Sequence, residues 1–115
     1  MNIFVAGATG VIGQPLLRLL GGAGHSVAGT TRSQSKAGII ESLGARAVTI
    51  DVFDAAALRR AVVAAKPDVI VHQLTDLPDT IDPARRAAMS ERNSRLRIEG
   101  TRNLKIGRAS CRERV

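Results

Sequence analysis

Short apolar runs alternate along this chain with longer stretches in which apolar residues recur at helical spacing. The runs that begin at Ile3, Ser26, Ala47 and Val69 are bounded by glycine, proline or polar residues, which is typical of buried strands. Helical spacing follows each run, over 11–20, 35–43, 55–65 and 83–104. This alternation predicts an α/β fold with a doubly wound parallel sheet and the strand order 3-2-1-4.

The expected helices begin at residues that favour helix starts. Ser35, Asp54 and Asp82 are expected as N-caps, and Pro83 occupies the first position of the last helix. Glu91 and Arg95 are spaced for an ion pair on the solvated face of that helix. Its apolar positions are Met89, Leu96, Ile98 and Leu104.

The segment after the first strand contains three spaced glycines, at the end of the sheet where ligands of such folds bind. In Gly7-Ala8-Thr9-Gly10-Val11-Ile12-Gly13, Gly7 is expected to allow a tight turn and Gly10 the approach of a pyrophosphate. Gly13 is expected to let the helix pack closely on the sheet. Together with Thr9 and the backbone N–H groups of Val11 and Ile12, the segment predicts dinucleotide binding. The alternative is a glycine turn with a structural role alone.

The residues after the second strand indicate which dinucleotide is bound. NAD-binding proteins usually have an acidic residue there, about 20 residues beyond the glycines. This chain has Arg32 and Ser33 instead, with Lys36 nearby. A guanidinium suits the 2′-phosphate of NADP because it pairs with phosphate in a bidentate way. We therefore expect NADP as the cofactor in preference to NAD, the alternative being that Arg32 and Lys36 are ordinary solvated charges.

The glycine segment resembles the fingerprint of the extended or atypical short-chain dehydrogenase/reductases, the NAD-dependent epimerase/dehydratase family. Asp51-Val52, after the third strand, is similar to the pair that contacts adenine in that family. Residues 69–75 are similar to its fourth strand, which implies that Leu74 and Thr75 line the nicotinamide-side ribose. Residues 99–104 resemble the Gly-Thr-x-Asn-Leu stretch of the next helix. The resemblance covers residues 1–104 and implies a Rossmann-type NAD(P)-binding domain.

The same resemblance implies an NAD(P)-dependent oxidoreductase, or a sugar-nucleotide epimerase or dehydratase, that acts on a small-molecule substrate. The chemistry of the family uses a Tyr-x-x-x-Lys pair with a Ser or Thr on later strands, and this chain contains no tyrosine. We therefore expect the cofactor-binding part of the fold alone, truncated after about four strands and without catalytic residues. The alternative is a non-catalytic, NADP-sensing regulatory protein of the same fold.

Composition excludes several other classes of protein. A single cysteine excludes an internal disulfide and a multi-cysteine zinc site, and His72 is expected to be a hydrogen-bonded core residue and no metal ligand. With two Phe and no Trp or Tyr, the chain is not expected to offer an aromatic platform for nucleic-acid bases, although its net charge of +7 leaves a small basic nucleic-acid binder as an alternative. No apolar stretch reaches the roughly 20 residues of a membrane span. We expect a soluble, cytoplasmic protein without nucleic-acid or membrane partners.

The last residues, 105–115, break the pattern with four bases, one acid and the only cysteine. We interpret them as a non-native tail that resembles the in-frame translation of a sequencing adapter. The alternative is a basic arm for nucleic acid or an anionic membrane. The predicted strand order also leaves the fourth strand as an unprotected apolar edge, through which we expect aggregation or self-association.

Overall fold

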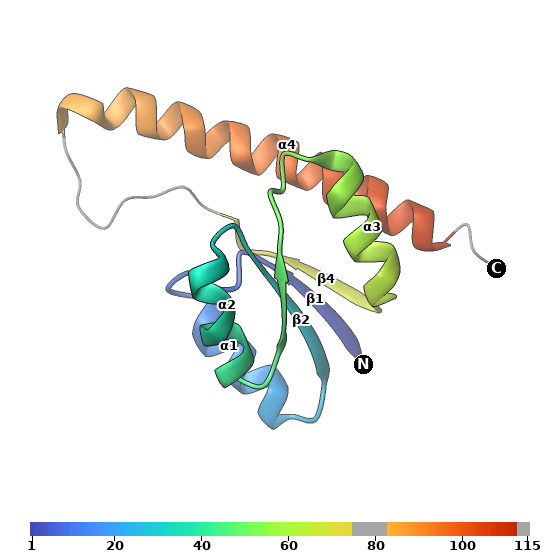
Figure 1. Ribbon diagram of the computed structural model, residues 1–115. Helices are drawn as coiled ribbons and strands as arrows, with labels where there is room; N and C mark the ends of the chain where they lie inside the picture. Colours follow the sequence, from blue (N-terminus) through green and yellow to red (C-terminus); the bar gives the residue numbers. More distant parts are fainter. Residues whose placement is uncertain (75–82, 113–115) are drawn as a thin grey trace.

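The computed structural model describes residues 1–74 and 83–112, and it has the predicted α/β architecture (Figure 1). The elements in chain order are β1 (Asn2–Ala6), α1 (Gly13–Gly22), β2 (Ser26–Thr31), the 3-10 turn η1 (Gln34–Lys36), α2 (Ala37–Ser42), β3 (Arg46–Thr49), α3 (Ala55–Ala65), β4 (Val69–His72), the 3-10 turn η2 (Pro83–Arg85) and α4 (Arg86–Arg112). The four strands are parallel and lie in the order β3-β2-β1-β4, which confirms the predicted order. In the register of the central strands, Phe4 is paired with Ala28 on one side and with Ile70 on the other.

Two helical layers cover the sheet, with α1 and α2 on one face and α3 and α4 on the other (Figure 1). Successive side chains of a strand point to opposite faces, so β1 contributes to both cores. Ile3 and Val5 pack with Leu17 of α1 and Ile40 of α2. On the other face, Phe4 and Ala6 belong to a cluster that also contains Leu58, Val62, Leu96 and Leu104.

Helix ends follow local chemistry, with three differences from the sequence prediction. Asp54 caps α3 as predicted, because its Oδ1 accepts a hydrogen bond from the N–H of Ala57 at 3.1 Å. Ser35 does not cap α2, because it lies inside the preceding 3-10 turn. α1 continues through Gly22 and ends before Gly24, whose φ of +86° is a left-handed conformation that terminates a helix. The predicted cap Asp82 lies outside the described residues. Pro83 does not occupy the first position of the last helix as predicted, because it begins the 3-10 turn η2 and α4 starts at Arg86.

The 27-residue helix α4 packs along α3 and extends beyond Leu104, where the sequence pattern breaks. Leu96 and Leu104 are buried, whereas Ile98 is 61% exposed. Close packing continues to Gly107, where a Cβ atom would lie 3.1 Å from the Cβ of Val62. Among the described residues, no helix is both long and apolar enough to cross a bilayer.

Candidate functional site

The three glycines of the loop between β1 and α1 differ in backbone conformation and in the space available for a Cβ atom. Gly7 has a φ of +82°, and a Cβ atom on it would lie 2.5 Å from the carbonyl oxygen of Gln73. A Cβ atom on Gly13 would lie 2.5 Å from the carbonyl oxygen of Gly7. A Cβ atom on Gly10 would lie 3.8 Å from the nearest atom, the carbonyl oxygen of Gly7. The fold therefore requires glycine at positions 7 and 13, whereas Gly10 leaves the backbone open to a close neighbour.

Backbone donors at the start of α1 lie on the open side of this loop. Val11 and Ile12 are 94% and 63% exposed. Within the described ranges 1–74 and 83–112, their N–H groups donate to no acceptor. Hydrogen bonding along the helix begins with the N–H of Gln14, which donates to the carbonyl of Gly10 at 3.2 Å. The N-terminus of α1 therefore offers donors and a partial positive charge of the kind that binds phosphate.

Three hydrogen bonds that sequence reasoning missed hold the loop in position. The Oγ1 of Thr30, which is 2% exposed, accepts from the N–H of Gly7 at 3.0 Å. The carbonyl of Thr30 accepts from the N–H of Ala8 at 3.0 Å, and the Nε2 of Gln14 donates to the carbonyl of Thr9 at 2.9 Å. In the sequence, the only indication of these hydrogen bonds is a hydroxyl residue near the end of an apolar strand.

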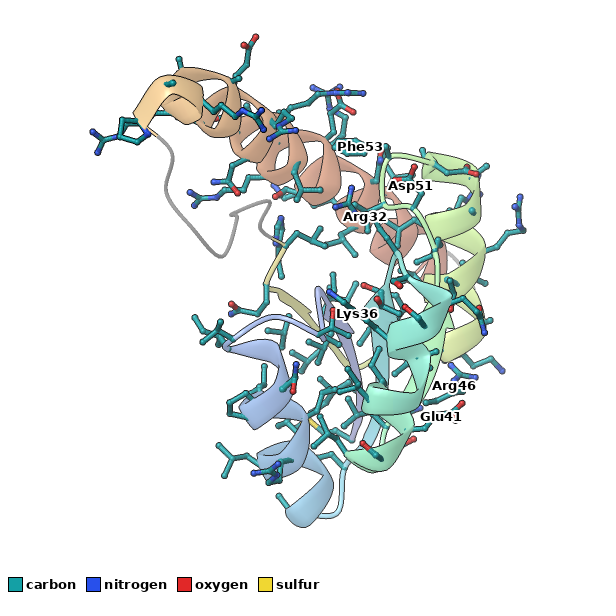
Figure 2. All side chains as sticks on the ribbon, turned by 60° about the vertical axis from the view of Figure 1, so that its left-hand side comes forward. Arg32, Lys36, Glu41, Arg46, Asp51 and Phe53 are labelled. Atoms are coloured by element: carbon teal, nitrogen blue, oxygen red, sulfur yellow. The ribbon has the colours of Figure 1, made fainter. Side chains whose placement is uncertain are left out.

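Arg32 follows β2 directly and lies at the carboxyl end of the sheet, as predicted. Figure 2 shows it at the same end as Asp51 and Phe53, whereas Glu41 and Arg46 lie toward the opposite end. The Arg32 side chain is exposed, and its guanidinium has no hydrogen bond or ion pair with any residue that the structure describes. Its donors are therefore available to an anionic ligand.

The rest of this loop is ordered by hydroxyl groups. The N–H of Ser33 donates to the Oγ1 of Thr31 at 3.2 Å, and the hydroxyls of Ser33 and Ser35 share a hydrogen bond of 2.6 Å. The N–H of Lys36 donates to the carbonyl of Ser33 at 3.0 Å, and the Lys36 side chain is exposed. The loop therefore has a defined backbone from which Arg32 projects.

The loop after β3 places a carboxylate at the same rim. The Oδ1 of Asp51 accepts from the N–H of Phe53 at 2.9 Å, and its carbonyl accepts from the N–H of Asp54 at 3.0 Å. Val52 is 2% exposed, so its side chain belongs to the core. The Nδ2 of Asn103, on α4, donates to the carbonyl of Val52 at 2.8 Å. This buried amide, to which sequence reasoning gave no role, fixes the backbone of the loop while the Asp51 side chain stays exposed.

α4 also contributes an arginine to this rim. The guanidinium carbon of Arg95 lies 4.5 Å from the centre of the Phe53 ring, and its Nε donates to Glu99 Oε1 at 3.0 Å. The hydrogen bond and the charge of Glu99 raise the pKa of Arg95 above its ordinary value, and the charge of Asp51 adds to this. The sequence prediction of Glu91 as the partner of Arg95 was wrong, because the guanidinium lies beside Phe53 and pairs with Glu99.

At the end of β4, His72 is hydrogen-bonded within the fold, as predicted, but it is half-buried and therefore not a core residue. Its Nδ1 accepts from the N–H of Leu74 at 3.2 Å, and its Nε2 donates to the carbonyl of Arg97 at 3.5 Å. Leu74 is 8% exposed, and a Cβ atom on Gly100 would lie 2.7 Å from its Cδ1. The Leu74 side chain is therefore part of the core, so that a contact with a ribose can come only from its backbone. Thr75 lies outside the described residues.

These loops form a rim that offers N–H donors, the guanidinium groups of Arg32 and Arg95, and the exposed carboxylate of Asp51. Nowhere among the described side chains do three His, Cys, Asp or Glu residues gather closely enough to hold a metal ion. The chemistry of the rim is therefore suited to a phosphate-containing ligand with a hydrogen-bonding base.

Comparison with known sequences identifies one family. The model of the NAD dependent epimerase/dehydratase family matches residues 3–99. A 3-diazoavenalumate denitrifying reductase from a Streptomyces species is 43% identical over 104 residues, which are 90% of this chain and 32% of that protein. This chain therefore spans about a third of the length of that relative.

Solved structures share the fold. The Bordetella bronchiseptica enzyme WbmG, in complex with NAD and UDP, has a TM-score of 0.70 and 24% identity over 96% of this chain and 34% of that one. The yeast methylglyoxal/isovaleraldehyde reductase Gre2, complexed with NADPH, has a TM-score of 0.68 and 22% identity over 93% of this chain and 32% of that one. These likenesses confirm the predicted Rossmann-type architecture.

Proposed function

The chain belongs to the NAD-dependent epimerase/dehydratase family, and we propose that it binds a nicotinamide dinucleotide, NADP in preference to NAD, across the carboxyl ends of its strands. One observation supports this most directly. The backbone at Gly10 is open to close approach, next to the exposed residues Val11 and Ile12, whose N–H groups have no acceptor in the described part of the chain. A dinucleotide fits this loop, because its pyrophosphate needs donors on a backbone without a Cβ atom in the way.

The pyrophosphate would be held by the glycine loop. Gly7 and Gly13 shape the turn, and the N–H groups of Val11 and Ile12 donate to the phosphate oxygens. Thr9 lies within the same loop, with its carbonyl already engaged by Gln14.

The remaining contacts follow from the other strand ends. Arg32 would pair with the 2′-phosphate beside Ser33, and this role is supported by its guanidinium, which has no partner within residues 1–74 and 83–112. The carboxylate of Asp51 would accept from the adenine amino group, and Val52 would contribute its backbone N–H. Leu74 and Thr75 would lie along the nicotinamide-side ribose.

The bound dinucleotide would supply hydride transfer, and this chain's own residues would bind and orient it. We propose that the chain is the cofactor-binding portion of a longer oxidoreductase, epimerase or dehydratase that acts on a small molecule. Its share of the Streptomyces reductase, 32%, is consistent with such a portion. The acid/base pair Tyr-x-x-x-Lys would then come from residues outside this sequence, which has no tyrosine.

Titration calorimetry with NADP⁺ and NAD⁺ tests the proposal. We expect the chain to bind NADP⁺ more tightly, and Arg32→Ala to lose that advantage so that the preference turns toward NAD⁺. Arg46→Ala is the matched control, because Arg46 is also an exposed arginine but begins β3, toward the opposite end of the sheet (Figure 2). Unchanged NADP⁺ affinity in Arg32→Ala would remove the assignment of the 2′-phosphate. Absence of binding to either dinucleotide would overturn the proposed function itself.

A further inference from the structure

We propose that Phe53 and Arg95 together form the wall on which the adenine ring of the cofactor stacks. This inference rests on the proposed function and adds a contribution from α4 to the adenine end of the site. The wall stands next to Asp51, whose carboxylate would accept from the adenine amino group. The starting observation is the pair itself, with the Arg95 guanidinium 4.5 Å from the centre of the Phe53 ring.

The position of the pair matches that of an adenine wall. Phe53 follows Asp51 and Val52 in the turn after β3, and its N–H is the donor that orients the Asp51 carboxylate. Figure 2 shows Phe53, Asp51 and Arg32 at the same end of the sheet. A base bound at Asp51 would therefore lie beside the guanidinium that covers Phe53.

Glu99 holds the guanidinium in a fixed plane. Its Oε1 accepts from Arg95 Nε at 3.0 Å and its Oε2 accepts from Nη2 at 3.5 Å, one helical turn away on α4. Two contacts along the same edge orient the plane better than one would. The entropy of ordering this arginine is thus already lost before a ligand binds, and a preordered surface binds more tightly.

The part of the Arg95 guanidinium that stays free is one of its planar faces, and this favours stacking with a base over phosphate binding. Glu99 occupies donors along one edge and offsets the charge, whereas the Arg95 side chain remains 63% exposed. A planar guanidinium stacks on aromatic rings, and bases stack on guanidinium planes. Arg32, in contrast, has no described partner, so its charge and donors suit the 2′-phosphate. The two arginines therefore have different roles at one rim.

The test compares 5′-ADP with 2′,5′-ADP, both of which contain the adenine but only one of which contains the 2′-phosphate. Affinities are measured by titration calorimetry for the full chain and for Arg95→Ala, Arg95→Lys, Phe53→Leu and the control Arg102→Ala. Arg102 is an exposed arginine of the same helix, and circular dichroism melting shows which variants remain folded. We expect Arg95→Ala and Phe53→Leu to weaken both nucleotides equally, by about 5- to 10-fold, the lower part of the range for base stacking.

Arg95→Lys distinguishes the contribution of the planar guanidinium surface from that of the positive charge. It keeps the cation and the pairing with Glu99 but loses the flat surface, so we expect a loss close to that of Arg95→Ala. Arg102→Ala should bind both nucleotides like the parent chain. A loss of affinity confined to 2′,5′-ADP would make Arg95 a phosphate ligand and overturn the proposed stacking wall. Full affinity for both nucleotides in either Arg95 variant would also overturn it. If the parent chain binds neither nucleotide, the proposed function fails as well. If it binds both and the Arg95 and Phe53 variants bind them with unchanged affinity, this inference alone fails.

Discussion

The hydroxyl of Thr30 accepts a 3.0 Å hydrogen bond from the backbone N–H of Gly7, 23 positions earlier in the chain. The neighbouring N–H of Ala8 donates to the Thr30 carbonyl, so two consecutive N–H groups of the glycine loop donate to the same residue of β2. Gly29 permits this contact, because a Cβ atom there would lie 2.7 Å from the Cβ of Ala8. The second strand thus positions the loop that we propose for the pyrophosphate.

Thr30→Val should therefore affect both stability and nucleotide binding. The valine fills the same space but leaves the N–H of Gly7 without its acceptor, which costs about 1–3 kcal/mol in a buried setting. Urea unfolding followed by circular dichroism measures the loss, and NADP⁺ affinity should fall with it. Thr30→Ser, which keeps the hydroxyl, should recover most of both. Equal stability of the Val and Ser variants would show that this hydrogen bond contributes nothing.

Alanine at Gly10 and at Gly13 should have opposite consequences. At Gly13 the methyl group meets carbonyl oxygens 2.5 Å and 2.7 Å away, so we expect Gly13→Ala to destabilise the fold by about 1–3 kcal/mol. At Gly10 there is room, so Gly10→Ala should leave the free energy of unfolding within about 1 kcal/mol of the parent. Its dinucleotide affinity should nevertheless drop, because the methyl group stands where the phosphate approaches. Unimpaired binding by Gly10→Ala would place the ligand elsewhere.

Asn103→Ala tests the link between α4 and the loop at Asp51. The change leaves the buried carbonyl of Val52 without its donor, so we expect a loss of about 1–3 kcal/mol in urea unfolding. Affinity for 5′-ADP should also decrease, because the loop that presents Asp51 loses its anchor. Arg102→Ala, next in the chain but exposed, should change stability by less than about 0.5 kcal/mol. Equal effects of the two substitutions would contradict a specific role for the amide.

β4 is expected to cause self-association. Within residues 1–74 and 83–112 it pairs with β1 alone, and Val69 is 38% exposed. Unpaired strand edges join other edges, and a lysine on the edge opposes this. Val69→Lys should therefore shift the chain toward monomer in sedimentation velocity, whereas Leu19→Lys, at a 72% exposed position of α1, should not. A parent chain that sediments as a single monomeric species would refute the expectation.

Features that depend on a few neighbouring residues were predictable. Asp54 caps α3 because its side chain reaches a donor three positions later. The close contacts around Gly7 and Gly13 agree with the structural roles expected from their spacing, whereas the pyrophosphate role of Gly10 stays a prediction. The prediction failed at Ser35, where a 3-10 turn forms in place of the expected helix start. Ser35 lies inside that turn, its hydroxyl forms a hydrogen bond with the hydroxyl of Ser33, and it caps no helix.

The amino-acid sequence by itself determined the order of the elements, the strand order and the glycine loop, since periodicity and turn chemistry act over short stretches of chain. It also placed Arg32 at the carboxyl end of the sheet, although the preference for NADP stays a prediction. Only the tertiary structure decided that Asn103 anchors Val52, that Leu74 turns into the core and that Arg95 lies over Phe53. These contacts depend on the rotation of α4 about its axis and on its position along α3, which are set by packing between segments far apart in the chain.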